Sequence, residues 1–305
     1  MPGIQPLGFL SFCGHKVPYH RVWKPLVDSP DFQAALTAAE RLIKPDVQAG
    51  ICTPQVPDIL RFLQFALVTA VLIGQDPYKQ AGYATGFAFD VNGLTSWTDL
   101  ANKCSGSKAA ALKTLVRLFF MTATDWSQKR KRRPTFRAAA KAADNQEFHL
   151  LPPQELFSHW QTVGILPLNA SLSTKVDESD AHRAAWTRVR PLIIQYIAKT
   201  WPGAVWFLWG TAAKDLAKLL PPGTVIHRAG HPDLQGTPEE SDQFFYDASG
   251  IPETWESVKW TGPNQGERHG FSIPPRLRRA RSVSKNSSDA TRHDTRRERE
   301  ERKAR

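Results

Sequence analysis

Four short motifs hold the side chains of this sequence that could do chemistry. They are Gly74-Gln75-Asp76-Pro77-Tyr78, Leu168-Asn169, Trp209-Gly210 and Gly230-His231-Pro232. Together they supply a carboxylate, an amide, aromatic faces and an imidazole, a set that can stabilise developing charge and pair with a polar ligand. Singly, each also fits a turn or a core position, so their meaning depends on whether the fold brings them together.

Each motif ends or directly follows a short apolar run that does not alternate with polar residues. These runs cover residues 68–73, 163–168, 204–209 and 224–226, the last continuing toward residue 229. Runs of this kind are typical of strands that are buried on both faces. Stretches with helical spacing precede or separate them, at residues 31–43, 57–66, 107–120, 181–199 and 211–219. The alternation predicts an α/β domain in which helices cover both faces of a parallel sheet.

Two of these helices have recognisable local signals. The helix at 107–120 follows Ser107, which is a suitable N-cap, and the helix at 181–199 begins behind Ser179 and Asp180. Pro191 should bend the second helix, because proline removes a backbone donor.

The predicted sheet brings the four motifs to one place. In an open parallel sheet, ligands bind beyond the carboxyl ends of the strands, where the loops converge. An acid, an amide, an aromatic residue and a histidine should therefore lie along one rim of the sheet. That convergence favours a functional site over four unrelated turns.

Other chemistries lack their characteristic residues. The sequence contains no GxxxxGK[ST] phosphate loop, no GxGxxG after the first strand, no HExxH, no GxSxG and no HxE paired with PCxxC. The three cysteines, Cys13, Cys52 and Cys104, are far apart and form no CxxC pair, which favours a reducing compartment and no structural zinc. We expect a site without a metal or a cofactor. No apolar run approaches the length of a membrane span, and nothing marks secretion.

Charge and composition divide the chain. With 305 residues and 41% hydrophobic content, it has enough apolar material for a folded domain. The net charge is +11, of which residues 276–305 carry +7 and the rest of the chain only +4. We predict an N-terminal arm at 1–20, a catalytic domain at 21–262 with a basic insertion near 125–148, and a basic disordered tail at 263–305.

The insertion contains an unbroken basic run from Lys129 to Arg133. Such a run fits a solvated surface loop about as well as it fits nuclear targeting and contact with DNA taken together. Together with the basic tail, it suggests residence in the nucleus.

The chemical motifs resemble those of one known family. Gly74-Gln75-Asp76-Pro77-Tyr78, the segment Gly86-Phe87-Ala88-Phe89, Leu168-Asn169 and His231-Pro232 follow one another as they do in the family 1 uracil-DNA glycosylases. The step from Tyr78 to Phe89 matches that family. Trp23 and the stretch from Pro252 to Trp255 extend the similarity over residues 20–260.

The resemblance implies a fold and a reaction. It implies a single α/β domain with a central four-stranded parallel sheet flanked by helices, as in uracil-DNA glycosylases. The activity would be hydrolysis of the N-glycosidic bond of a uracil that has been flipped out of single- or double-stranded DNA, leaving an abasic site. The resemblance implies no cofactor. We expect a monomer and make no prediction about protein partners.

The resemblance also implies a role for each matching residue. Asp76 would position the attacking water and stabilise the sugar cation, and His231 would donate a hydrogen bond to uracil O2. Asn169 would pair with uracil O4 and N3–H, Phe89 would stack on the base, and Tyr78 would exclude a thymine methyl. Gln75 would help to bind the substrate, Lys79 would contact phosphate, and Leu234 would be the wedge inserted into DNA.

Several features depart from the family pattern. Lys79 replaces the usual histidine, and the loop after His231 is one residue short of the family's HPSPLS before its leucine, with Asp233 in place of a serine. The proline-rich segment expected after Phe89 and the HFSKxN element are missing, and the interval from Phe89 to Asn169 is longer than usual. These differences leave two alternatives open. One is a catalytically weak or inactive DNA-binding accessory factor with the same fold, and the other is an enzyme that excises a different base.

Overall fold

The computed structural model describes the chain in six stretches. They are residues 8–106, 108–124, 126, 133–233, 244–245 and 249–264. The predicted tail at 263–305 and the basic run at 129–133 therefore lie almost wholly outside the described residues. Within the described part of the chain, no helix is long and apolar enough to cross a membrane.

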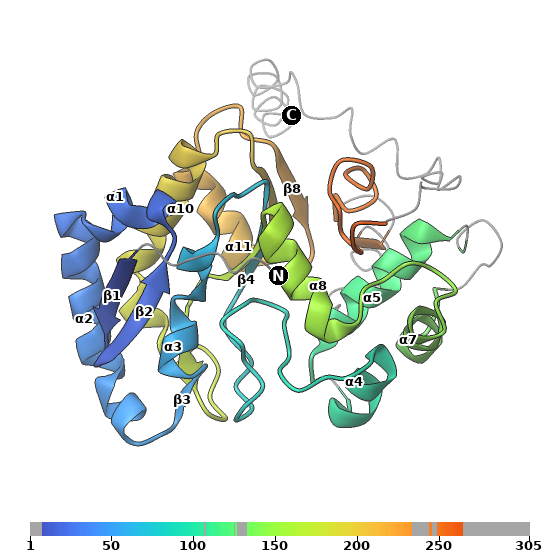
Figure 1. The fold of residues 1–305 in the computed structure, drawn as a ribbon, viewed down its shortest axis with the longest axis horizontal. Coiled ribbons are helices and arrows are strands. Elements are labelled where there is room, and N and C mark those ends of the chain that lie inside the picture. The colour runs from blue at the N-terminus through green and yellow to red at the C-terminus, as the bar shows by residue number, and fades with distance from the viewer. Residues whose placement is uncertain are drawn as a thin grey trace, which may run out of the picture. The chain divides into compact units, whose positions relative to one another are not determined.

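A four-stranded parallel sheet forms the centre of the domain, which confirms the predicted fold class (Figure 1). Its strands are β4 (Ala70–Gly74), β5 (Ile165–Asn169), β7 (Val205–Trp209) and β8 (Ile226–Ala229), in the order β5-β4-β7-β8. All four strands run in parallel, so their carboxyl ends meet at one rim. Every residue of β4 and β5 is buried, as non-alternating apolar runs require.

Position in the sheet explains the proline in β5. Pro167 cannot donate a ladder hydrogen bond, and β5 is an edge strand, where that loss is tolerated. The backbone N–H of Ala88 donates to the Pro167 carbonyl at 3.0 Å, so the segment around Phe89 runs along the free edge of β5. This contact brings the Gly86–Phe89 segment to the rim where β4 and β5 end.

Helices pack around this sheet on both sides (Figure 1). One group contains α1 (Lys24–Val27), α2 (Pro30–Gln48), α9 (Arg183–Trp186) and α10 (Val189–Thr200). The other contains α4 (Trp97–Lys103), α5 (Ala110–Ala123) and α7 (Phe136–Asp144). α8 (Pro153–Val163) packs against β5, and α11 (Thr211–Lys214) packs against β7. Eight tryptophans are fully buried among these elements, so large aromatic side chains fill much of the core.

The N-terminal segment differs from the predicted arm. Its strands β1 (Gly8–Phe12) and β2 (His15–Tyr19) form an antiparallel hairpin. The turn residues Cys13 and Gly14 both have positive φ, as a two-residue hairpin turn requires. Phe12 and Val17 are fully buried in the core, so these residues form part of the domain.

Three predicted helices are broken or shorter than the sequence suggested. The predicted helix at 57–66 is a short helix α3 (Val56–Ile59) followed by a 3-10 turn (Arg61–Gln64). The predicted helix at 181–199 is observed as two helices, α9 and α10, with a break between them. Pro191 is the third residue of α10, a position where the missing N–H of proline breaks no helical hydrogen bond. The range 211–219 is α11 followed by a 3-10 turn (Asp215–Leu219).

The start of α5 also differs from the prediction. Its N-cap is Ala109, with φ of 53°, whereas the predicted cap Ser107 lies outside the described residues. The short strands β3 (Cys52–Thr53) and β6 (Thr174–Lys175) pair with each other beside the main sheet.

Part of the predicted insertion is an ordinary structural element. Its helix α7 packs against α4 and α5. The Asp144 carboxylate at the end of α7 accepts hydrogen bonds from the backbone N–H groups of Trp97 and Thr98, both at 2.8 Å. It thereby caps the N-terminus of α4, which favours negative charge.

Candidate active site

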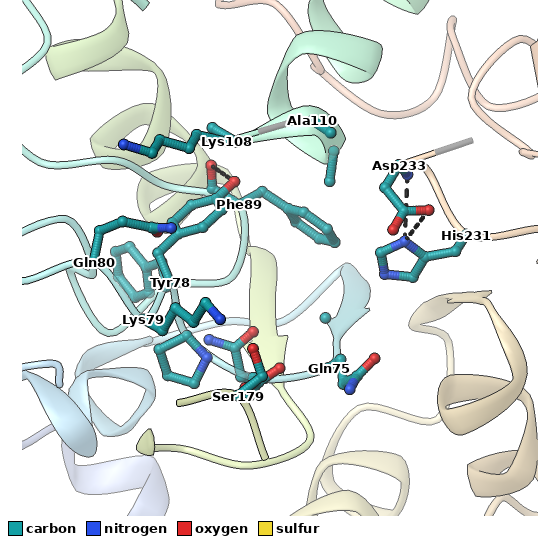
Figure 2. Close-up of a pocket in the computed structure, with 17 residues that line it drawn as sticks. Gln75, Tyr78, Lys79, Gln80, Phe89, Lys108, Ala110, Ser179, His231 and Asp233 are labelled. Carbon is teal, nitrogen blue, oxygen red and sulfur yellow. Dashed lines mark hydrogen bonds and ion pairs between the residues drawn. The ribbon is translucent and has the colours of Figure 1, made fainter. Parts of the chain in front are cut away.

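The predicted site residues gather around one pocket at the carboxyl rim of the sheet. The pocket has a volume of about 370 Å³. Its lining includes seven of the eight residues predicted from the sequence: Gln75, Asp76, Tyr78, Lys79, Phe89, Asn169 and His231 (Figure 2). The eighth, Leu234, lies outside the described residues, so its predicted role as a wedge stays a prediction.

Asp76 follows the end of β4 and is half-buried. The backbone N–H of Asp180 donates to its carboxylate Oδ2 at 2.9 Å. Burial raises the pKa of Asp76 above the ordinary value, the nearby Asp180 carboxylate adds to this rise, and the Asp180 N–H, Lys79 and His231 oppose it. The protein thus keeps a poorly solvated carboxylate in a fixed orientation.

Asn169 ends β5 directly beside Gly74, its register partner at the end of β4. The asparagine is only 3% exposed, and its amide nitrogen has no hydrogen-bond partner within the described structure. Gly74 makes room for it, because a Cβ there would stand 2.5 Å from the Asn169 Oδ1 atom. A buried amide donor without a partner is costly, and a polar ligand in the pocket would satisfy it.

Two aromatic residues form the wall of the pocket. The Tyr78 hydroxyl donates to the Phe89 carbonyl at 3.4 Å and accepts from the backbone N–H of Leu112 in α5. Burial raises the pKa of Tyr78, which therefore stays neutral. Phe89 has φ of 68°, in the left-handed region that phenylalanine rarely adopts, and its ring packs against Trp209. Strained backbone of this kind is concentrated at functional sites.

His231 follows β8 and is paired with a residue two positions further on. Its Nδ1 atom lies 2.8 Å from the Asp233 carboxylate, and the Asp233 backbone N–H points at the same nitrogen from 3.3 Å (Figure 2). The side chain is 36% exposed. The second ring nitrogen is turned away from Asp233 and is therefore available to a ligand (Figure 2).

The remaining two predicted residues lie on the same loop as Asp76. The Gln75 amide Nε2 donates to the Asp180 carboxylate at 2.9 Å. Lys79 lines the pocket, and its carbonyl accepts a hydrogen bond from the Asp177 N–H at 2.9 Å. The loop after β4 is thus fixed by residues that follow β6.

Sequence reasoning missed two parts of the site. Asp180, which we expected to lie just before a helix, instead holds both Asp76 and Gln75. The start of α5, from Lys108 to Ala111, lines the pocket as well. No sequence pattern identifies Asp180, because its contact with Asp76 uses the backbone N–H that every residue except proline carries.

A second cavity adjoins the first. It has a volume of about 550 Å³ and shares Gln75, His231 and Asp233 with the first pocket. Its lining has mixed charge, with the exposed Arg183 and Lys214 beside the carboxylates Asp215 and Asp233. The two cavities together offer a polar pocket beside a surface that carries exposed basic side chains as well as carboxylates.

The chemistry of the site follows from the polar side chains that line it. The described residues include no group of three or more His, Cys, Asp or Glu side chains that could hold a metal ion. A carboxylate, an imidazole and an unpartnered amide face one cavity whose wall is aromatic. This combination suits a polar, planar ligand and a reaction in which charge separates between two parts of the substrate.

Fold and site together define an α/β protein with a ligand pocket at the carboxyl ends of a four-stranded parallel sheet. No family model matches the chain. A "Uracil-DNA glycosylase" of Chromobacterium violaceum is 25% identical over 219 residues, which cover 70% of this chain and 77% of that protein. One of Flavobacterium johnsoniae is 23% identical and covers 71% and 84%, respectively.

Solved structures show the same likeness at the level of the fold. The wild-type UNG crystal structure from Nitratifractor salsuginis superposes with a TM-score of 0.54 at 18% sequence identity, covering 74% of this chain and 90% of that one. The fold is therefore that of the UNG structures, and the chain belongs to the uracil-DNA glycosylase superfamily.

Proposed function

We propose that this protein is a uracil-DNA glycosylase that hydrolyses the N-glycosidic bond of uracil in DNA and leaves an abasic site. The observation that carries the proposal is the buried Asn169 amide, whose unpartnered nitrogen lies in the same cavity as Asp76 and His231. The curated relatives named uracil-DNA glycosylase support it. Within the superfamily, we assign the chain to family 1, on the residues from Gly74 to Tyr78 and on His231.

Asp76 and His231 act on opposite charges in this reaction. As the glycosidic bond breaks, positive charge develops on the sugar and negative charge on the departing uracil. The Asp76 carboxylate stabilises the sugar cation and orients the water that attacks C1′. His231 donates a hydrogen bond to uracil O2 through its free ring nitrogen.

Asn169, Tyr78 and Phe89 select the base. The Asn169 amide donates to uracil O4 and accepts from N3–H, whereas the N4 amine of cytosine would oppose its donor. The fixed Tyr78 ring occupies the space that a thymine methyl needs. Phe89 provides a stacking face, and Gln75 supports the loop that binds the base.

DNA would reach this pocket past the exposed basic side chains beside it. A pocket of this kind admits a base only after the nucleotide leaves the duplex, so the enzyme flips its target. Lys79, Lys108, Arg183 and Lys214 line the two adjoining cavities and are suited to contact phosphates on either side of the flipped nucleotide. Contact of the basic tail with DNA and residence in the nucleus stay predictions.

An accessory factor that only binds DNA is the second candidate. The shortened loop after His231 and the added basic segments favour it. The site argues against it, because a scaffold needs no buried amide with an unpartnered donor beside a half-buried carboxylate. The two candidates differ in a single measurable property, the release of uracil.

That property is tested with purified protein and an end-labelled oligonucleotide that contains one uracil. The strand should become sensitive to alkaline cleavage at the uracil in both single- and double-stranded form, with a chelator present, because the proposed mechanism gives no role to a metal. Asp76→Asn is the matched control and should remove most of the cleavage. Wild-type protein that binds the oligonucleotide but releases no uracil identifies the accessory factor instead.

A further inference from the structure

A hydrogen-bonded chain of Ser, His and Asp lies outside the pocket. The Ser173 Oγ atom is 2.9 Å from Nδ1 of His182, and Nε2 of His182 is 3.1 Å from the Asp46 carboxylate. We call these three residues the buried triad. Ser173 is fully buried, and the His182 side chain exposes 4% of its surface.

The Asp46 carboxylate, which can only accept, indicates the direction of the hydrogen bonds in the triad. The indole Nε1–H of Trp186 donates to Ser173 Oγ at 3.0 Å, and indole can only donate. Burial raises the pKa of the neighbouring Cys52 thiol to about 11, and the Ser173 hydroxyl opposes this rise. The Nε2–H group of His182 therefore donates to Asp46, and with Nε2 as the donor, Nδ1 is the nitrogen that can accept from the Ser173 hydroxyl.

This arrangement is unsuited to nucleophilic catalysis. The Ser173 hydroxyl has no exposed surface, and its partners occupy it fully. The triad instead connects three parts of the chain that are far apart in sequence: Asp46 near the end of α2, Ser173 after β5, and His182 just before α9. Such a fully satisfied polar network specifies one conformation.

The triad holds one end of a loop that reaches the active site. We call residues 175–182 the bracing loop. Directly before it, the Thr174 hydroxyl donates to the Glu178 carbonyl at 2.7 Å and accepts from the Ala181 N–H at 3.3 Å, so it bonds two residues of the loop. At its start, the Val176 N–H donates to the Ile51 carbonyl at 2.7 Å. The loop is thus fixed at both ends as well as internally.

The bracing loop makes three hydrogen bonds to the loop after β4. Asp180 N–H donates to the Asp76 carboxylate, Gln75 Nε2 donates to the Asp180 carboxylate, and Asp177 N–H donates to the Lys79 carbonyl. Asp180 has φ of 60°, a strained conformation that nearby structure must maintain. His182 lies only two residues further along the chain and is the best-anchored residue of this loop.

We propose that the buried triad is a positioning device for Asp76, which it holds in its reactive orientation through His182, the bracing loop and the backbone N–H of Asp180. The inference rests on the proposed role of Asp76 in uracil release. His182 and Asp46 are positioning residues, because neither lines the pocket. A small displacement of the Asp76 carboxylate is enough to lower the rate strongly.

The test is a double-mutant cycle between His182→Ala and Asp76→Asn, measured as single-turnover uracil release. His182→Ala should lower the rate about tenfold or more while the Kd for a uracil-containing oligonucleotide stays within about threefold. In the Asp76→Asn background, the same change should cost less than about twofold, because the residue that it positions is already lost. His159→Ala is the control, since His159 lies on α8 and bonds only the Lys259 carbonyl among the described residues.

Each outcome has one meaning. A folded His182→Ala protein with the wild-type rate, or an equal loss of rate in both backgrounds, overturns the inference and leaves the triad a purely structural feature. If Asp76→Asn itself releases uracil at the wild-type rate, the proposed function of Asp76 is what fails.

A second pair of variants covers the case in which His182→Ala does not fold. Asp46 is only half-buried, so substitution there is easier to accommodate. Asp46→Ala removes the acceptor for His182 Nε2–H and should lower the single-turnover rate, whereas Asp46→Asn retains an acceptor oxygen and should restore most of it. Equal rates in the two variants would contradict the proposal.

Discussion

The two sides of the pocket are built in different ways. On one side, Asp76 is held by Asp180, a residue 104 positions away in sequence, within a loop that the buried triad anchors. On the other side, His231 is held by Asp233, two positions along the same loop, and is 36% exposed. Residues 234–243, which follow it, lie outside the described structure.

This contrast follows from what each side must do. The Asp76 carboxylate acts on the sugar and on water at fixed positions, so rigidity contributes directly to its effect. His231 lies on the loop that carries the predicted wedge Leu234 and has to accommodate DNA. We infer that the fold holds Asp76 in place before the substrate binds, whereas His231 is oriented by its neighbour Asp233 in the same loop.

The largest effects should come from the two charged groups themselves. Asp76→Asn removes the negative charge beside the sugar cation, and His231→Leu removes the donor to the leaving base. Each should lower the single-turnover rate of uracil release by about 10²- to 10³-fold, as expected for the loss of one electrostatic contact in a transition state. Wild-type rates in both variants would show that the site lies elsewhere.

The next largest effect concerns the wall that both sides share. Tyr78→Ala removes a ring whose hydroxyl is fixed by Phe89 and Leu112, so it should admit thymine and cost about tenfold in the rate on uracil. Tyr78→Phe keeps the ring and is the matched control. Oligonucleotides with a single uracil or a single mismatched thymine measure both activities. If Tyr78→Ala keeps its uracil activity and still ignores thymine, the ring does not exclude the methyl group.

The parts of this site that follow strands could be predicted from the sequence. Asp76, Asn169 and His231 directly end or follow apolar runs, and the parallel arrangement of those runs fixes the rim at which they meet. The predicted strand at 68–73 is observed at Ala70–Gly74, a small shift at the ends. Burial on both faces gives β4 and β5 a signal that needs no knowledge of their neighbours, whereas the prediction of a fully buried strand was wrong for β8, in which only Ala229 is buried.

Elements that depend on distant contacts could not be predicted in this way. The hairpin of β1 and β2 has alternating burial and a Cys13-Gly14 turn, a weaker signal that we interpreted as an arm. Asp180 was expected just before a helix, and its actual partners, Asp76 and Gln75, are more than 100 positions away. The buried triad is likewise invisible in the sequence, because Asp46, Ser173 and His182 have no fixed spacing.

A smaller effect is expected on the His231 side. The Asp233 N–H can donate to Nδ1 only if that nitrogen has a lone pair, whereas the Asp233 carboxylate at 2.8 Å favours a proton there. Asp233→Ser removes the second influence, favours the tautomer with Nε2–H, and should raise the single-turnover rate by roughly twofold to fivefold. Asp233→Asn, which also removes the charge but keeps the volume, is the control.

Nitrogen chemical shifts of His231 in these variants report the tautomer directly. A lower rate in both variants would show instead that the carboxylate assists the imidazole as it meets the negative charge on the leaving base. In that case the interaction between His231 and Asp233 would be as important to the rate as the contacts of the bracing loop with Asp76.

The smallest expected effect is a shift in the pH dependence on the Asp76 side. Asp76 acts in its charged form, and the neighbouring Asp180 carboxylate contributes to raising the pKa of Asp76. Asp180→Asn removes that like charge but retains the backbone N–H and an oxygen that can accept from Gln75. The pKa of Asp76 should therefore fall, and the acid limb of the single-turnover rate should move to lower pH by less than about one unit, with the rate at neutral pH little changed. Asp177→Asn in the same loop is the matched control, since its backbone, not its carboxylate, contacts the Asp76 loop. An acid limb that stays in place, or moves to higher pH, would show that Asp180 acts on Asp76 through its backbone alone.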